Sequence, residues 1–183
     1  MKALLIVDLQ NDFCPGGALP APDGDRIVPV INKLMDKFDV VLASKDWHPL
    51  NTVHFEKWPV HCVRETPGAE FHPALDASKI DKIFLKGTND KDDGYSAFEA
   101  TNDTLRDYLR KKQVDEVYIT GLVTEYCVKQ TVLEVLRQGF KSFLIEDAVQ
   151  GIGAHPDDVA LAKAEMKKAG AFIIKALEVS KTV

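Results

Sequence analysis

Residues 115–139 have the sequence DEVYITGLVTEYCVKQTVLEVLRQG. The stretch begins with a short apolar run at 115–120 and continues, after a turn, into an amphipathic segment, Glu125–Gln138, that ends at Gly139. A glycine just past the last periodic residue is a common stop signal for a helix. The pattern therefore predicts a buried strand, a short turn and a helix, with Cys127 in the first turn of that helix.

Further apolar runs rich in Val, Ile, Leu and Phe recur along the chain. Most are continuous rather than alternating, which is typical of strands buried on both faces. Amphipathic segments separate most of these runs, so the chain is predicted to be an α/β protein whose parallel sheet is covered on both sides. The runs lie near residues 3–8, 39–44, 82–86, 141–145 and 171–174, and the other predicted helices are Ile27–Phe38, Phe98–Lys112 and Pro156–Ala169.

The size and composition of the chain narrow the range of functions. It has 183 residues, of which 45% are hydrophobic and 28% charged, and its net charge is −5. We expect a single domain over residues 1–183, no nucleic-acid partner because no basic stripe is present, and no membrane partner because no apolar run approaches about 18 residues. Ala3–Val7 is too short for a signal peptide. Three cysteines, Cys14, Cys62 and Cys127, cannot all pair, so we expect reduced thiols in a cytoplasmic protein.

Three reactive side chains follow the ends of three predicted strands: Asp8, Lys86 and Cys127. The carboxyl ends of parallel strands lie at one edge of a sheet, which is where open α/β sheets bind ligands. A carboxylate near a thiol can accept its proton and return it to a leaving amine, and a lysine beside both keeps the carboxylate ionised. The sequence therefore predicts a thiol amidase with these three residues as its catalytic set.

The predicted helix start around Cys127 favours the same chemistry. We expect Thr124 to be the N-cap, so that free N–H groups and the positive end of the helix dipole lie beside the thiol. A cysteine placed in this way can titrate below its ordinary pKa of about 8.5, and the same N–H groups can stabilise an oxyanion. The structural alternatives are a buried, inert Cys127, a cap or salt bridge at Asp8, and a Lys86 amine that reaches solvent at the rim.

A Pro-rich stretch at residues 46–80 interrupts the alternation of strands and helices and contains four of the five histidines. A long loop of this kind inside a compact domain is either functional or disordered, and its aromatic and imidazole groups favour an ordered loop. Imidazole and carboxylate ligands suit Zn²⁺, Fe²⁺ or Mn²⁺. We expect one divalent metal ion held by four side chains of this loop: Asp46, His48, His54 and His61.

The other histidines and cysteines carry no predicted role. His72 falls outside the spacing of the metal cluster, and His155 starts a predicted helix at the surface. Cys14 lies in a Pro-Gly loop and Cys62 follows a predicted metal ligand, so both are predicted to be packing residues. A metal-bound thiolate at Cys62 is the alternative.

Taken together, these residues resemble the nicotinamidase/pyrazinamidase branch of the isochorismatase-like cysteine hydrolases. The resemblance extends from Met1 to about Phe172, nearly the whole chain. The Asp-Lys-Cys set marks the superfamily, whereas the Asp-x-His, His-Phe and Trp-Pro-x-His elements are specific to the branch. The matching segments are Val7-Asp-Leu-Gln-Asn-Asp-Phe13 with Pro15-Gly-Gly17, Asp46-Trp-His-Pro49, His54-Phe55, Trp58-Pro-Val-His-Cys62, Thr66-Pro-Gly-Ala-Glu70, Lys86-Gly87, Tyr95-Ser-Ala-Phe98 and Gly121-Leu-Val-Thr-Glu-Tyr-Cys127.

The resemblance implies a three-layer α/β/α, Rossmann-like domain with a six-stranded, mainly parallel sheet. It implies the same catalytic set and the same metal ligands, with an open metal position that takes a pyridine nitrogen. It also implies that Phe13 and Trp58 flank the aromatic ring of the substrate and that Tyr95 lies near the pocket.

The resemblance implies a cis peptide between Leu122 and Val123. The backbone N–H groups of Val123 and Cys127 would then form the oxyanion hole. Many relatives have Ala where this chain has Val123, so we expect the bulkier side chain to crowd the pocket.

The activity implied is hydrolysis of nicotinamide to nicotinate and ammonia through a cysteine thioester, as a step of NAD salvage, with pyrazinamide as a second substrate. A small molecule would be the partner, and a homodimer is compatible with the sequence. Another member of the superfamily is the first alternative: an isochorismatase, an N-carbamoylsarcosine amidase or a ureidoacrylate hydrolase. The histidine-rich loop disfavours these enzymes, because they generally do not bind a substrate ring nitrogen through a metal ion. A non-catalytic metal-binding or thiol-sensing protein on the same fold is the second alternative.

Overall fold

The computed structural model describes residues 1–180 and contains a six-stranded sheet, with every pair of strands parallel and the order β3-β2-β1-β4-β5-β6. This confirms the predicted α/β class; the last three residues of the predicted domain, 181–183, lie outside the described residues. The strands are β1 (Lys2–Val7), β2 (Val40–Asp46), β3 (Lys82–Lys86), β4 (Glu116–Leu122), β5 (Lys141–Gln150) and β6 (Phe172–Ile174). The α-helices are α1 (Val28–Met35), α2 (Leu105–Lys111), α3 (Lys129–Arg137) and α4 (Asp158–Lys168).

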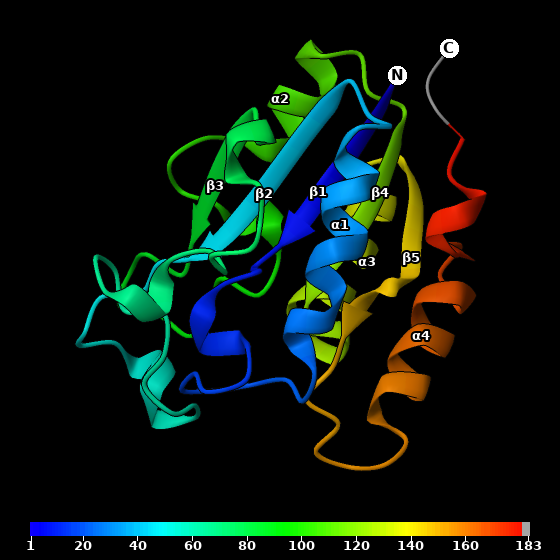
Figure 1. The fold of residues 1–183 in the computed structure, drawn as a ribbon. Coiled ribbons are helices and arrows are strands. Elements are labelled where there is room, and N and C mark those ends of the chain that lie inside the picture. Colours follow the sequence, from blue (N-terminus) through cyan, green and yellow to red (C-terminus); the bar gives the residue numbers. More distant parts are fainter. Residues whose placement is uncertain (181–183) are drawn as a thin grey trace.

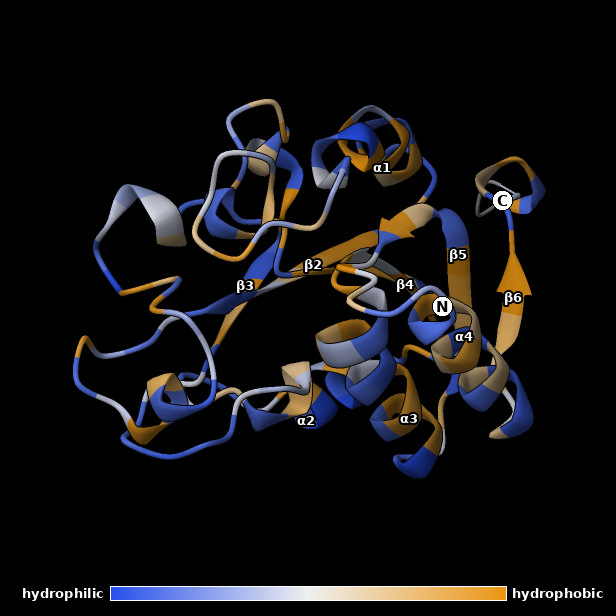
Figure 2. Ribbon diagram, turned by 90° about the horizontal axis from the view of Figure 1, so that it is seen from below, coloured by the Kyte–Doolittle hydropathy of each residue, from blue (hydrophilic) through white to orange (hydrophobic). Residues whose placement is uncertain are grey.

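The central strand β1 shows why its sequence is apolar without alternation. Successive side chains of a strand point to opposite faces of the sheet. Leu5 and Val7 pack into the core layer with α2, α3 and α4, whereas Leu4 and Ile6 pack into the layer with α1. Figure 2 shows α1 on one side of the sheet and the other three helices on the opposite side. Because both faces are covered, every inner position of the strand is apolar.

The helix predicted from Ile27 begins close to where the sequence places it. A 3-10 turn, Gly24–Ile27, leads into α1, and Pro29 lies in the first turn of the helix. Proline is tolerated at this position because the first N–H groups of a helix have no partner within the helix.

The helix predicted at Phe98–Lys112 is shorter than expected, since α-helical structure begins only at Leu105. The side chain of Asn102 accounts for the difference. It donates to the carbonyl of Ile83 at 3.0 Å and accepts from the N–H of Leu85 at 2.8 Å, so the chain before α2 is bound to the edge strand β3. An edge strand presents unpaired backbone groups, and here a side chain pairs them.

The strand order reverses between β1 and β4. The chain runs from β1 through β2 to β3 at one edge, and then crosses to β4, β5 and β6 on the other side. The crevice at such a reversal, outside the carboxyl ends of the strands, is the usual ligand site of open α/β sheets. Asp8 follows β1 directly and Cys127 lies just beyond β4, so both are placed at this crevice. Figure 1 shows the β1 and β2 arrowheads at the same end of the molecule.

The Pro-rich stretch between β2 and β3 folds over the same end of the sheet (Figure 1). It contains three 3-10 turns, at Val53–Glu56, Pro67–Ala69 and Ala77–Lys79. The carboxylate of Asp12 accepts from the backbone N–H of Cys62 at 2.7 Å and thereby ties the stretch to the loop after β1. Within residues 1–180, no helix is long and apolar enough to cross a membrane.

Candidate active site and metal site

A buried lysine lies at the centre of the candidate site. Lys86, the last residue of β3, is fully buried, and the strand register pairs it with Asp46 at the end of β2. Its ammonium lies 2.7 Å from Asp8 Oδ2 and pairs with Asp46 Oδ1 at short range. It also donates to the carbonyl of Gly94 at 2.6 Å and lies 3.5 Å from the Cys127 Sγ. One cation therefore connects two carboxylates and a thiol, and the predicted catalytic set is brought together in space.

Burial determines which of these groups carries a proton. Burial raises the pKa of Asp8 to about 6, although the Lys86 ammonium opposes the shift. Burial also raises the pKa of Cys127 well above its usual range, with Lys86 lowering it only in part. The expectation of an easily ionised thiol is therefore wrong for the free protein, because desolvation outweighs the nearby charge. At neutral pH the thiol keeps its proton beside a carboxylate that is ionised and can accept it.

The turn before the thiol depends on a glycine. Gly121 has φ +107° and lies so close to the carbonyl of Val7 on β1 that a Cβ would collide with it. A positive φ and a close backbone approach together require glycine. The Leu122–Val123 peptide is cis, as the resemblance implies.

The helix after this turn does not start with the predicted cap. A single π-helical turn, Thr124–Val128, precedes α3, the N-cap position is held by Val123, and no side chain caps the helix. The Thr124 Oγ1 is buried without a hydrogen-bond partner. The N-cap prediction for Thr124 is wrong because the hydroxyl lies inside the first turn rather than ahead of it. Cys127 does lie in the first turn, as predicted.

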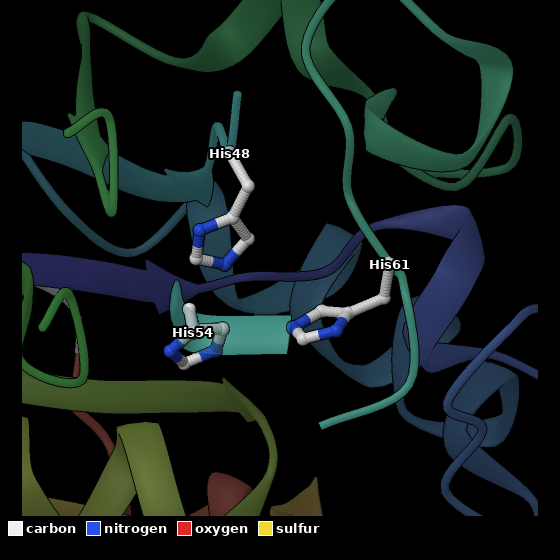
Figure 3. A group of neighbouring side chains, drawn as sticks. All are labelled: His48, His54 and His61. Carbon is white, nitrogen blue, oxygen red and sulfur yellow. The ribbon is translucent and has the colours of Figure 1, made fainter. Parts of the chain in front are cut away.

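Three imidazoles face one another beside this cluster (Figure 3). His48 follows β2, His54 lies on the next 3-10 turn and His61 lies in the segment beyond, and one ring nitrogen of each lies within 4.8 Å of the others. The second carboxylate oxygen of Asp46 is 3.6 Å from His48 Nε2 and 3.9 Å from His61 Nε2. All four residues are buried. The structure thus gathers the four predicted metal ligands around one space.

The outer nitrogen of each imidazole already has a partner. Nδ1 of His48 lies 2.9 Å from the carbonyl of Gly87, and Nδ1 of His61 lies 2.6 Å from the carbonyl of Pro59. A carbonyl only accepts, so both Nδ1 atoms donate, and each Nε2 keeps its lone pair for the space between the rings. Gly87 leaves room for this contact, because a Cβ there would collide with the His48 ring.

Burial keeps two of the imidazoles in the form that binds metal. Burial lowers the pKa of His54 to about 4, and burial also lowers the pKa of His61, so both rings are neutral at neutral pH. The His48 Nε2 is buried and has no hydrogen-bond partner. Imidazoles with a partner on each Nδ1, together with an adjacent carboxylate, fit the donor set of a divalent metal site.

A small pocket joins the two clusters. It contains the thiol, three of the four predicted metal ligands and all three predicted substrate-binding residues, Phe13, Trp58 and Tyr95. Trp58 lies edge-on to Tyr126, with 4.9 Å between ring centroids. The pocket is lined by Phe13, Leu19, Asp46, His54, Trp58, His61, Gly94, Tyr95, Val123, Tyr126, Cys127 and Ile152.

Sequence reasoning missed several residues that shape this site. Gln10 is fully buried and clamps the backbone of Asp46, donating to its carbonyl and accepting from its N–H, both at 2.8 Å. Ser44 donates to Asp8 Oδ1 at 2.7 Å. Tyr126 was detectable, since it precedes the thiol on the same turn, whereas Ile152 lies after β5 with no chemical signal in its side chain.

The residues without a predicted role also lie outside the ligand set. Cys14 and Cys62 are both free and buried. The group of donor atoms at the imidazoles does not include Cys62, so its thiolate alternative gains no support. His72 accepts from a local backbone N–H, and His155 is exposed.

A parallel α/β sheet with a buried thiol, carboxylate and ammonium at the reversal of its strand order is the arrangement of a cysteine hydrolase. A family model described as "Isochorismatase domain" matches residues 2–178. The chain belongs to this family.

The relatives of this chain include enzymes with named substrates. A nicotinamidase of Escherichia coli (strain K12) is 42% identical, over 94% of this chain and 93% of its own. A solved pyrazinamidase of Pyrococcus horikoshii in complex with zinc is 44% identical, with a TM-score of 0.86 and coverage of 95% of this chain and 98% of that one. A solved L. infantum protein in complex with nicotinate is 30% identical, with a TM-score of 0.90 and coverage of 97% and 93%.

Proposed function

We propose that this protein is a nicotinamidase, which hydrolyses nicotinamide to nicotinate and ammonia and also accepts pyrazinamide, in NAD salvage. The observation that carries the proposal is the joint lining of one pocket by a thiol and by an imidazole–carboxylate metal site. The names of the relatives support the same substrate class. We take residues 1–183 to form one catalytic domain.

In the first half of the reaction, Asp8 accepts the proton of Cys127 as the sulfur attacks the carboxamide carbon. A carbon–sulfur bond forms, and the carbonyl oxygen takes up the negative charge. The backbone N–H groups of Val123 and Cys127 are the proposed donors to this oxyanion. The Lys86 ammonium, 2.7 Å from Asp8, holds that carboxylate in place for the transfer.

The second half of the reaction restores the thiol. Protonated Asp8 gives its proton to the departing nitrogen as the carbon–nitrogen bond breaks, which releases ammonia and leaves a thioester on Cys127. Asp8 then takes a proton from a water molecule that attacks the thioester. The carbon–sulfur bond breaks, Asp8 returns its proton to the sulfur, and the acid product loses its remaining proton to solvent as nicotinate.

We propose that Asp46, His48, His54 and His61 hold a Zn²⁺, Fe²⁺ or Mn²⁺ ion. A bound ion of this kind supplies a Lewis-acid position for the pyridine nitrogen of the substrate. Phe13, Trp58 and Tyr95 would enclose the ring, which sets the carboxamide against the thiol.

The experiment that tests the function is product analysis with purified, metal-loaded protein and nicotinamide. We expect ammonia and nicotinate in equal amounts. Absence of both products with Cys127 reduced would contradict the proposal, and the alternative amides of the superfamily would then be tested as substrates.

The rate is expected to depend on the ionisation of Asp8. Only the ionised carboxylate accepts the thiol proton, and burial raises its pKa to about 6. kcat/KM should therefore be constant above this pH and fall about tenfold per pH unit below it. A pH–rate profile between pH 4 and pH 8, taken at about room temperature with nicotinamide far below KM, measures this directly. The ordinary aspartate pKa is 3.8, so a plateau that extends to the acid end of this range would contradict the assignment.

Removal of the metal is expected to raise the KM for nicotinamide by about tenfold or more, since one lost ligand contact of about 1.4 kcal/mol has that effect. Benzamide is the matched control, because it has the same shape but lacks the ring nitrogen. Its KM should be the same in metal-loaded and chelator-treated protein. Equal changes for the two amides would show that the metal acts on the fold rather than on the ring nitrogen.

A further inference from the structure

The loop after β3 places one carboxylate between the metal ligands and the aromatic side of the pocket. Asp92 Oδ1 lies 3.1 Å from His54 Nδ1 and 2.8 Å from the hydroxyl of Tyr95. Its other oxygen pairs with the ammonium of Lys57. The Tyr95 hydroxyl lies 3.0 Å from Trp58 Nε1. A continuous chain of side-chain hydrogen bonds therefore leads from the aromatic pocket to a metal ligand.

The direction of every hydrogen bond in this chain is fixed by chemistry. The indole N–H of Trp58 can only donate, so the Tyr95 oxygen accepts from it and turns its own proton toward Asp92. An ionised carboxylate only accepts, so the Nδ1 of His54 must carry the second proton. This leaves the lone pair of His54 Nε2 directed at the other imidazoles (Figure 3).

His54 differs from the other two imidazoles in the nature of its partner. His48 and His61 donate to backbone carbonyls, which no substitution removes. His54 alone among the three donates to a side chain, and that side chain carries a negative charge. A carboxylate partner raises the basicity of a ligating imidazole and fixes the orientation of its ring.

We propose that Asp92 is a positioning residue that sets the affinity of the metal site through His54 and, through Tyr95, holds Trp58 against the substrate ring. The second part rests on the proposed function, whereas the first part does not. The hydrogen bonds from His54 and from Tyr95 are accepted by the same oxygen atom of Asp92. Loss of Asp92 should therefore impair metal binding and substrate binding together. Loss of the Tyr95 hydroxyl should impair only substrate binding.

The test is a Zn²⁺ titration in competition with a chromophoric chelator, on the full chain and four variants. For Asp92→Ala we expect the Kd for Zn²⁺ to rise by about 10–100-fold, the usual effect of losing the partner of a metal ligand. Asp92→Asn keeps an oxygen that can accept from His54 but loses the charge, so its Kd should lie between those of Asp92→Ala and the wild type. Tyr95→Phe should leave the Kd unchanged.

Asp90→Ala is the matched control for the loop itself. The Asp90 carboxylate accepts from the backbone N–H of Val53 at 2.8 Å, so it anchors the turn that carries His54 without touching the imidazole. Its Kd for Zn²⁺ should rise much less than that of Asp92→Ala. An unchanged Kd in Asp92→Ala, or an equal rise in Asp90→Ala, would overturn the proposal that Asp92 sets the metal affinity.

The second readout is the KM for nicotinamide at saturating Zn²⁺. Both Asp92→Ala and Tyr95→Phe should raise KM, and Tyr95→Phe at least as much, because it removes the acceptor of Trp58 Nε1 whereas Asp92→Ala removes only the acceptor of the Tyr95 hydroxyl. A KM that changes in neither variant would overturn the role of Asp92 in the pocket. If the wild type binds Zn²⁺ but turns over no nicotinamide, the proposed function fails. The Kd comparison then still tests whether Asp92 sets the affinity for Zn²⁺. A wild type that binds no Zn²⁺ would overturn both.

Discussion

Replacement of Cys127 by alanine is expected to lower kcat/KM for nicotinamide by at least about 10⁴-fold, as loss of a catalytic nucleophile does in other enzymes. The reason is the position of the thiol in the pocket, 3.5 Å from the Lys86 ammonium and beside the carboxylate that takes its proton. The donor atoms at the three imidazoles remain, so the variant should bind Zn²⁺ with wild-type stoichiometry. Ammonia release and metal content, measured on the same sample, check both statements.

Cys14→Ala is the control for loss of a buried thiol. Cys14 is 3% exposed and does not line the pocket. This variant should keep most of the activity. A Cys127→Ala protein that hydrolyses nicotinamide near the wild-type rate would rule out the thiol as nucleophile.

Replacement of Lys86 by methionine is expected to lower the free energy of unfolding by about 3–5 kcal/mol, the usual cost of leaving buried charges unpaired. Met has nearly the length of Lys, so the space is filled while the carboxylates of Asp8 and Asp46 lose their common counter-ion. The pKa of Asp8 should then rise further, since the ammonium is the largest effect that lowers it. Urea denaturation in metal-free buffer measures the loss, and turnover at neutral pH should fall with it.

Lys45→Met is a matched control one strand away. Lys45 is 6% exposed and lies 2.7 Å from Glu70, but the Glu70 side chain is 55% exposed and can be hydrated when its partner is lost. We therefore expect a smaller loss of stability than for Lys86→Met, with turnover retained. Equal decreases in the free energy of unfolding in the two variants would show that the buried carboxylates of Asp8 and Asp46 do not need Lys86 as a counter-ion.

The fold and the meeting of the reactive residues could be predicted because they depend on strand periodicity. Asp8, Asp46 and Lys86 each end or directly follow a strand, and parallel strands bring such ends together. The register that sets Asp46 opposite Lys86 follows from sheet geometry once the strands are known. The histidines could be grouped because they are close in sequence.

Properties that depend on three-dimensional environment could not be predicted in this way. The shift in the pKa of Cys127 is set first by burial, which the sequence of a helix start does not reveal. The length of α2 is set by the bond between Asn102 and the edge strand. Asp92 carries no motif, and its role becomes visible only where His54 and Tyr95 meet it.

The central claim is that hydrolysis passes through an acyl group on Cys127, and interception with hydroxylamine tests it most directly. With metal-loaded enzyme and nicotinamide, a thioester partitions between water and hydroxylamine. Nicotinohydroxamate should therefore form at the expense of nicotinate, while the rate of ammonia release does not fall. Equal amounts of nicotinate and ammonia, with no hydroxamate at any hydroxylamine concentration, would contradict the account.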